Sequence, residues 1–200
     1  MGRPIAFSTD ELLDGALHVF VQEGYEAAHV TDIAARGGVS KPTLYARVGG
    51  KHELFLSVVD REARRLVHHL LRRYARADGR SARATVAIAV DALFEYCAAE
   101  RDSFVLLFST RLGGPAFDRD TLILNQVQSG IARLIAGHLQ RAQAVSPGAL
   151  RIVAALCADI TITAARGAVE GGDVSLAHAQ RISEAAIGAL LLSDTPRLWS

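Results

Sequence analysis

The amino-acid sequence predicts an all-α protein, with an N-terminal helix-turn-helix of three helices followed by a larger helical region. Apolar residues recur at three- and four-residue steps along most of the chain, and hardly any segment alternates with the two-residue period of a strand. Short groups of Gly, Pro and Ser separate the helical stretches. Apolar residues make up 50% of the 200 residues, so the chain can bury a sizeable core.

The first helix is predicted over residues 9–23. Ser8 and Glu11 have the spacing of a capping box, in which the Ser8 hydroxyl caps the helix and the Glu11 carboxylate reaches back to the Ser8 amide. Gly24 is expected to end this helix, because the residue that follows a helix often takes positive φ. A single apolar stripe runs along it, formed by Leu12, Leu13, Ala16, Leu17 and Phe20.

Two very short helices are predicted next. We expect Thr31 to cap the first, over about residues 32–36, before a glycine pair ends it. We expect Ser40 to cap the second, over about residues 41–47. Pro42 is tolerated in the first turn because the amide at that position has no helical partner.

Helices of about two turns are too short to be stable alone, so this pair must pack on the helix of residues 9–23. Two such helices joined by a tight turn form a helix-turn-helix, whose second helix fits a DNA major groove about 12 Å wide. The side chains expected to pack inward are Ile33, Ala34, Val39 and Leu44.

The rest of the chain is predicted to be helical as well. A long fourth helix should begin at Lys51 and reach about residue 77. Further helices are expected over about residues 81–99, 101–111, 115–141, 147–171 and 174–193.

The charge of the whole chain carries no signal for nucleic acid, so the argument has to be local. The formal net charge is +1, and residues 1–60 carry five basic and eight acidic side chains. Between Thr31 and Lys51, however, four basic side chains stand against one acidic side chain, a balance of +3. Thr31 and Ser40 are expected at helix N-termini, where hydroxyls and free amides can hold phosphate oxygens.

Residues 8–60 resemble the N-terminal signature of TetR-family transcriptional regulators. The resemblance rests on elements at fixed spacing: an apolar helix ending in Phe20, Gly24-Tyr25, Val30-Thr31-Asp32-Ile33-Ala34, Gly38-Val39-Ser40, Thr43-Leu44-Tyr45, and Lys51 with Glu53-Leu54-Phe55. It implies a DNA-binding domain over residues 1–52 and a helical effector-binding and dimerisation domain over residues 53–200. It also implies a homodimeric repressor that binds double-stranded, pseudo-palindromic operator DNA and is released from it by a small molecule.

The resemblance assigns roles to individual positions. The recognition-helix residues meet bases or adjacent phosphates, and Thr31 and Lys51 grip the DNA backbone. The family usually has an aromatic or His pair and then Phe where this chain has Ala46, Arg47 and Val48, so Val48 should pack less against the first helix. The complete expected DNA-binding set is Thr31, Ser40, Lys41, Pro42, Thr43, Tyr45, Arg47 and Lys51.

The C-terminal region has no motif of its own. The resemblance implies that its last two helices, residues 147–193, pair across a two-fold axis. Their many small residues permit close helix approach, although burial within one chain would select the same residues. An apolar pocket in the middle helices would favour an apolar or aromatic effector, with ordinary core packing as the alternative. The candidate lining is Phe94, Cys97, Phe104, Leu107, Phe108 and Phe117.

Several charged and sulfur-containing residues have a structural interpretation. The Arg-rich stretch of residues 61–76 is interleaved with leucines and is read as a solvated helix face with long-range steering of DNA as a secondary effect. His68 and His69 diverge by about 100° on a helix, which disfavours joint metal binding. Cys97 and Cys157 have no metal-ligand spacing and are read as small buried hydrophobes.

No cofactor, metal or catalytic chemistry is predicted, because the chain has no phosphate-binding loop and no triad pattern. The longest uncharged run, residues 121–132, is too short to span a membrane, and residues 1–10 lack a signal peptide, so we expect a cytoplasmic protein. Two alternatives remain. One is a helical enzyme, and the other is a helical ligand-sensing or interaction module without DNA binding, which the acidic balance of residues 1–60 and Val48 would favour.

Overall fold

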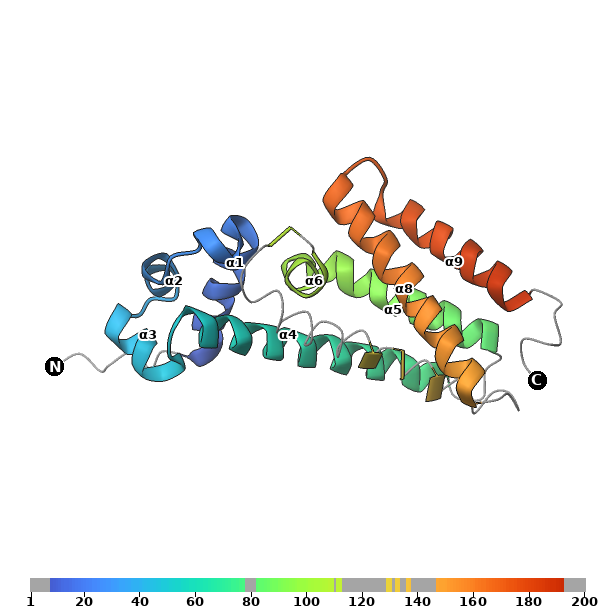
Figure 1. The fold of residues 1–200 in the computed structure, drawn as a ribbon, viewed down its shortest axis with the longest axis horizontal. Helices are drawn as coiled ribbons and strands as arrows, with labels where there is room; N and C mark the ends of the chain where they lie inside the picture. The colour runs from blue at the N-terminus through green and yellow to red at the C-terminus, as the bar shows by residue number, and fades with distance from the viewer. Residues whose placement is uncertain are drawn as a thin grey trace. The chain divides into compact units, whose positions relative to one another are not determined.

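The computed structural model describes residues 8–77, 82–109, 111–112 and 147–192, together with residues 129–130, 132–133 and 136–137. Every regular element within these ranges is helical, which confirms the predicted fold class (Figure 1). The predicted helix over residues 115–141 lies mostly outside the described residues, and Phe117 lies wholly outside them. The elements are α1 (Thr9–Ala27), α2 (Val30–Arg36), α3 (Lys41–Val48), α4 (Lys51–Tyr74), η1 (Ala75–Ala77), α5 (Ala82–Ala99), α6 (Arg101–Phe108), α8 (Pro147–Gly171) and α9 (Leu176–Leu192).

The described chain divides into two compact units. The first contains α1, α2, α3, the part of α4 up to Ala63, and α6 from Asp102 onward. The second contains the rest of α4 together with η1, α5, α8 and α9. The predicted boundary between residues 52 and 53 separates a DNA-binding domain from an effector-binding domain, whereas the two units are defined by contacts alone. That boundary stays a prediction.

The C-terminal ends of α4 and α6 differ from the prediction. The fourth helix is α-helical only to Tyr74 and finishes in the tighter turn η1. α6 ends at Phe108 rather than at residue 111. The Ser109 hydroxyl accepts a hydrogen bond from the Arg111 amide at 3.1 Å, and this local turn competes with helical continuation.

The capping box at the start of α1 is confirmed. The Ser8 hydroxyl accepts from the Asp10 amide at 3.1 Å, and the Ser8 amide donates to Glu11 Oε2 at 3.2 Å. The helix therefore begins where the sequence places it. Its apolar stripe is buried along its whole length, at Leu12, Leu13, Ala16, Leu17 and Phe20.

A break at Gly24 turns the end of α1 back toward the core. Gly24 has φ +78°, a conformation that suits glycine, and the chain then makes a further turn to Ala27. The break lets the Tyr25 amide donate to the carbonyl of Leu112 at 2.9 Å. It also places the Tyr25 ring edge-on to Phe55 of α4, with 5.0 Å between ring centroids. Tyr25 is consequently a core residue of the first unit.

α2 packs on α1 where two glycines meet. A Cβ atom on Gly37 would lie 2.9 Å from Leu12 Cδ1 and 3.1 Å from the carbonyl oxygen of Ile33. A Cβ atom on Gly15 of α1 would lie 3.2 Å from the backbone nitrogen of Gly37. The two backbones therefore approach each other more closely than larger residues would permit.

Gly37→Ala should lower the free energy of unfolding by about 1–3 kcal/mol, because the added methyl group overpacks the contact with α1. Gly171→Ala is the matched control, since a Cβ atom there meets nothing within 4 Å. It should be neutral or stabilising by up to about 1 kcal/mol. Urea unfolding measures both, and equal stability of the two variants would contradict the close contact.

In the second unit, α5, α8 and α9 pack against one another (Figure 1). The Gln180 side-chain amide of α9 donates to Asp91 of α5 at 2.7 Å and to Glu184 at 3.0 Å, so it bridges two carboxylates. Burial raises the pKa of Asp91, and the nearby Glu184 carboxylate raises it further, while Arg73 opposes the shift. Arg73 itself pairs with Glu95 at 2.9 Å.

Asp91→Asn should stabilise the protein at neutral pH by less than about 1 kcal/mol, the scale of partly exposed charge interactions. The folded pKa of Asp91 lies above its ordinary value of 3.8, so folding favours the protonated form. Its contribution to stability is therefore complete below pH 3.8 and is lost as the pH rises through the folded pKa. Thermal unfolding against pH should show the gain vanish in acid, whereas Glu95→Gln, which breaks an ion pair, should not stabilise.

Both cysteines are buried free thiols, as predicted. Burial raises the pKa of Cys97 to about 12, against a small opposing influence of Arg101, and that of Cys157 to about 11. Neither thiol forms a disulfide in this structure. They behave as small apolar side chains of the helical core.

Within the described chain, residues Arg151–Gly171 of α8 are long and apolar enough to cross a membrane by length and composition. The prediction that the chain has no such segment rested on runs of residues without any charge. This segment was passed over because it contains Asp159 and Arg166. Charged side chains are rare at membrane depth. α8 packs on α5 and α9, and the interior helix of a bundle has the same composition.

Candidate nucleic-acid interface

Ser40 caps α3 as predicted. Its hydroxyl accepts from the Thr43 amide at 3.3 Å and lies 2.7 Å from the Thr43 hydroxyl. Pro42 occupies the first turn, where its missing amide costs nothing. A glycine-containing turn precedes this cap, and the Val39 amide donates there to the carbonyl of Ala34 at 2.9 Å.

α3 has one buried position and an otherwise open surface. Leu44 is fully buried, and together with Ile33 and Ala34 of α2 it fixes the pair of helices in the core. Tyr45 is 46% exposed although it is aromatic, and the Lys41 ammonium lies 6.0 Å from its ring centroid. The predicted contact residues of α3 are all exposed: Lys41, Pro42, Thr43, Tyr45 and Arg47.

The prediction that Thr31 caps α2 is wrong. α2 begins at Val30, and its N-cap is His29, whose carbonyl accepts from the amides of Asp32 at 3.0 Å and Ile33 at 3.1 Å. A hydroxyl cap at Thr31 would require extended backbone there and would unwind this turn. Thr31 is instead an exposed residue of the first turn of α2, and the expected phosphate contact stays a prediction.

Lys51 joins the end of α1 to the start of α4. Its ammonium donates to the carbonyl of Glu26 at 2.8 Å and lies 4.8 Å from the ring centroid of Tyr25. An ammonium group has three donors, so this contact leaves donors for a phosphate oxygen. The structure therefore gives Lys51 a positioning role that the sequence did not indicate, and DNA contact by Lys51 stays a prediction.

The surface of α2 and α3 carries an excess of positive charge. Arg36, Lys41 and Arg47 are exposed, and Asp32 is the acidic residue of the same two helices. A surface of this kind attracts phosphate, and the attraction weakens with salt.

The five candidate effector residues that the structure describes are all buried, but they do not fall within one compact unit. Phe94 and Cys97 belong to α5 in the second unit, and Phe104, Leu107 and Phe108 belong to α6 in the first. Within each unit they are core residues.

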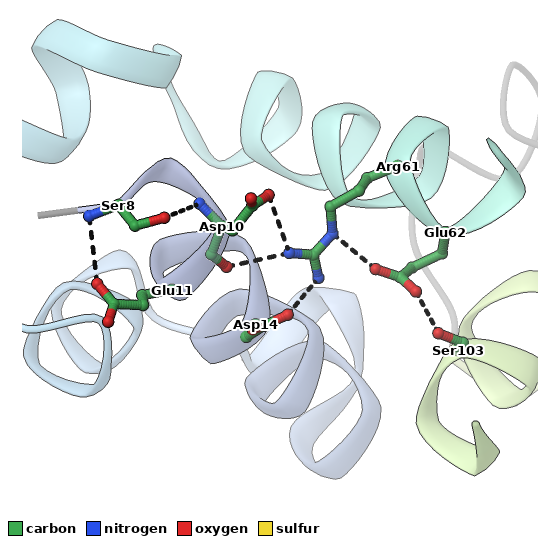
Figure 2. Close-up of polar contacts among 7 residues, drawn as sticks. All are labelled: Ser8, Asp10, Glu11, Asp14, Arg61, Glu62 and Ser103. Carbon is green, nitrogen blue, oxygen red and sulfur yellow. Dashed lines mark hydrogen bonds and ion pairs between the residues drawn. The ribbon is translucent and has the colours of Figure 1, made fainter. Parts of the chain in front are cut away.

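The interpretation of the Arg-rich stretch as solvated is wrong for two of its residues. The Arg61 side chain is 15% exposed and forms an ion pair with Asp14 of α1 at 2.7 Å (Figure 2). Arg73 pairs with Glu95 of α5. Both face acidic side chains of other helices, which the spacing along α4 does not reveal. Four arginines of the stretch are exposed: Arg64, Arg65, Arg72 and Arg76.

Within the described part of the chain, no group of three or more His, Cys, Asp and Glu side chains is placed to hold a metal ion. His69 Nε2 lies 3.0 Å from the carbonyl oxygen of Ala92, while His68 is exposed. The two imidazoles thus have different surroundings.

Comparison with known proteins identifies the helix-turn-helix. The family model described as "Bacterial regulatory proteins, tetR family" matches residues 12–58, from α1 to the first turns of α4. This N-terminal segment belongs to the TetR family. The matched residues thus cover most of α1, all of α2 and α3, and the start of α4.

Two curated relatives and one solved structure extend the comparison. The HTH-type transcriptional activator FasR of Mycolicibacterium smegmatis is 38% identical over 98 residues, 49% of this chain and 44% of FasR. The HTH-type transcriptional repressor ComR of Escherichia coli is 45% identical over 60 residues, 30% of this chain and 29% of ComR. Both matches span less than half of the relative's length. A cysteine variant of the TetR-family regulator CifR, solved with 26-bp operator DNA, is 27% identical with a TM-score of 0.65, over 94% of this chain and 99% of that chain.

Proposed function

We propose that this TetR-family chain is a sequence-specific transcriptional regulator that inserts α3 into the major groove of operator DNA. The observation that carries the proposal is the open polar surface of α3 around a single buried anchor, Leu44. Tyr45 and Lys41 are exposed on a helix that the buried Leu44 anchors in the core. This is the arrangement needed to contact base edges. The CifR structure, which contains operator DNA, supports this use of the fold.

The phosphate contacts are expected from the rim of α3. Ser40 and Thr31 lie at the starts of two helices, where hydroxyls and backbone amides favour anions. Arg47 and Lys51 add positive charge near the other end of α3. Affinity should therefore fall steeply with salt, roughly in proportion to the number of phosphates contacted.

We further propose a homodimer formed through α8 and α9, within residues 147–193. Large apolar side chains on both helices are exposed in the single chain: Ile152 is 64% exposed, Leu156 43% and Ile182 50%. A two-fold pair of α3 helices would then address a pseudo-palindromic operator, with half-sites about 34–36 Å apart.

Regulation by a small apolar or aromatic molecule in the cytoplasm completes the proposal, with repression as the expected outcome. The apolar composition of α5 and α6 supports this class of effector. FasR is named an activator and ComR a repressor, so the direction of regulation needs a reporter assay on the operator. A panel of apolar compounds that left the melting temperature unchanged would count against the effector class.

The decisive experiment is a titration against duplexes that flank the protein's own gene, at two salt concentrations and with a scrambled competitor. Competitor-resistant binding that weakens with salt supports the proposed regulator. If neither these duplexes nor any duplex from a random pool binds better than the scrambled one, the chain is a helical sensing module without DNA binding.

Tyr45→Ala should weaken operator binding by about 10–100-fold, the range for loss of a specific contact. The melting temperature should stay within about 2 °C because Tyr45 is not a core residue. Leu71→Ala is the matched control, since Leu71 of α4 is 45% exposed, against 46% for Tyr45. Fluorescence anisotropy measures both variants, and equal affinities would remove Tyr45 from the interface.

Ile152→Glu should convert the dimer to a monomer, because a carboxylate at the centre of an apolar contact remains unpaired. Sedimentation velocity measures the mass in solution. Leu71→Glu, at an exposed apolar position outside α8 and α9, is the control and should stay dimeric. A dimeric Ile152→Glu variant would point to a different interface.

A further inference from the structure

Glu62 is a carboxylate within the apolar face of α4. It lies one helical turn from Val58 and one from Leu66, and all three side chains are fully buried. Burying a carboxylate is costly unless its oxygens receive hydrogen bonds or ion pairs. The hydrogen-bond partners of Glu62 therefore indicate its structural role.

One carboxylate oxygen of Glu62 has its donor on α4 itself, and the other has its donor on α6 (Figure 2). Oε1 accepts from Nε of the neighbouring Arg61 at 2.7 Å. Oε2 accepts from the hydroxyl of Ser103, which comes from α6 and is itself buried. Glu62 thus connects α6 to the guanidinium group of Arg61 within the first compact unit.

Arg61 directs its remaining nitrogens to the start of α1. Nη1 donates to the carbonyl of Asp10 at 3.0 Å, and Nη2 pairs with Asp14 Oδ1 at 2.7 Å. A guanidinium group is planar and rigid, so the orientation of Nε determines where the other two nitrogens point. The contacts therefore form a continuous path from Ser103 through Glu62 and Arg61 to the first turns of α1.

We propose that Ser103 is a positioning residue, whose hydroxyl holds Glu62 and Arg61 in the arrangement that fixes the first turns of α1. α2 packs on α1 and α3 packs on α2, so the path sets the geometry of the helix-turn-helix through α1. Removal of the Ser103 hydroxyl takes a buried donor from Glu62 Oε2, which lets the carboxylate turn and loosens its contact with Arg61. The consequence for DNA rests on the proposed function, whereas the coupling of Ser103 to α1 does not.

Two further contacts connect α1 to α6 or the segment after it, and they give the path a specific signature. His18 of α1 lies 3.4 Å from Asp102 of α6, and the Tyr25 amide donates to the carbonyl of Leu112. His18 attaches the middle of α1, and Tyr25 attaches its end. Loss of the Ser103 hydroxyl should therefore loosen the first half of α1 and leave the second half attached.

The test is amide hydrogen exchange of the full chain, comparing wild type with Ser103→Ala, Asp14→Asn and the double variant. Ser103→Ala should speed exchange of residues 12–17 about tenfold, the scale for losing a hydrogen bond to a charged group. In the Asp14→Asn background, the same change should add a smaller factor, because Arg61 has already lost its ion pair with α1 and keeps its hydrogen bond to the Asp10 carbonyl. Ser57→Ala is the matched control, since the Ser57 hydroxyl donates within its own helix, to the carbonyl of Glu53 at 2.8 Å, and it should leave residues 12–17 unchanged.

Faster exchange confined to α6, or an effect of Ser103→Ala that is undiminished by Asp14→Asn, would overturn the inference. Global loss of protection in Ser103→Ala would also overturn it, since that is the behaviour of a merely structural residue. In the second arm, the variants are titrated against a duplex that wild type enriches from a random pool. If wild type enriches none, the proposed function fails and the exchange data still decide the inference.

Discussion

The contact between Gly15 of α1 and Gly37 at the end of α2 is the constraint on which the first unit depends. α2 and α3 have seven and eight residues, too few to persist as isolated helices. They are stable because Ile33 and Leu44 are buried, and that burial requires the backbone of α2 to come within reach of α1. The surface of α3 stays open because Leu44 is the one residue of this helix that is buried in the core.

Polar contacts then fix what apolar packing leaves adjustable. Apolar side chains tolerate small rotations of one helix on another, whereas an ion pair or a hydrogen bond is directional. In the first unit, Lys51 ties the end of α1 to the start of α4, and Arg61 ties the beginning of α1 to the middle of α4. α1 is thus held near both ends by cations of the same helix.

Sequence reasoning succeeded where the cause is local. The capping box at Ser8, the cap at Ser40 and the inward side of Leu44 follow from residues within one or two turns, and all were predicted. The cap of α2 was misplaced because the His29 side chain makes no capping hydrogen bond. A helix start without a side-chain cap has no signature among the residue types.

The sequence reasoning failed where the cause is distant. The hydroxyl that donates to the Glu62 carboxylate lies 41 positions further along the chain, so the neighbouring residues do not indicate a partner for a buried carboxylate. Position 62 does fall on the spacing of Val58 and Leu66, and a charge on such a stripe is the one signal that could have been read. The inward direction of Arg61 was missed for the same reason, since its partners lie on α1.

The two buried thiols make the chain a convenient subject for spectroscopy. Burial raises the pKa of both thiols well above neutral pH, and the thiolate is the species that reacts with maleimides. The native protein therefore provides an almost silent background for site-directed labelling. A single cysteine introduced on the surface of α3 or α8 could carry a spin label or fluorophore without removal of Cys97 or Cys157, and distances across an assembly could be read in the otherwise unaltered sequence.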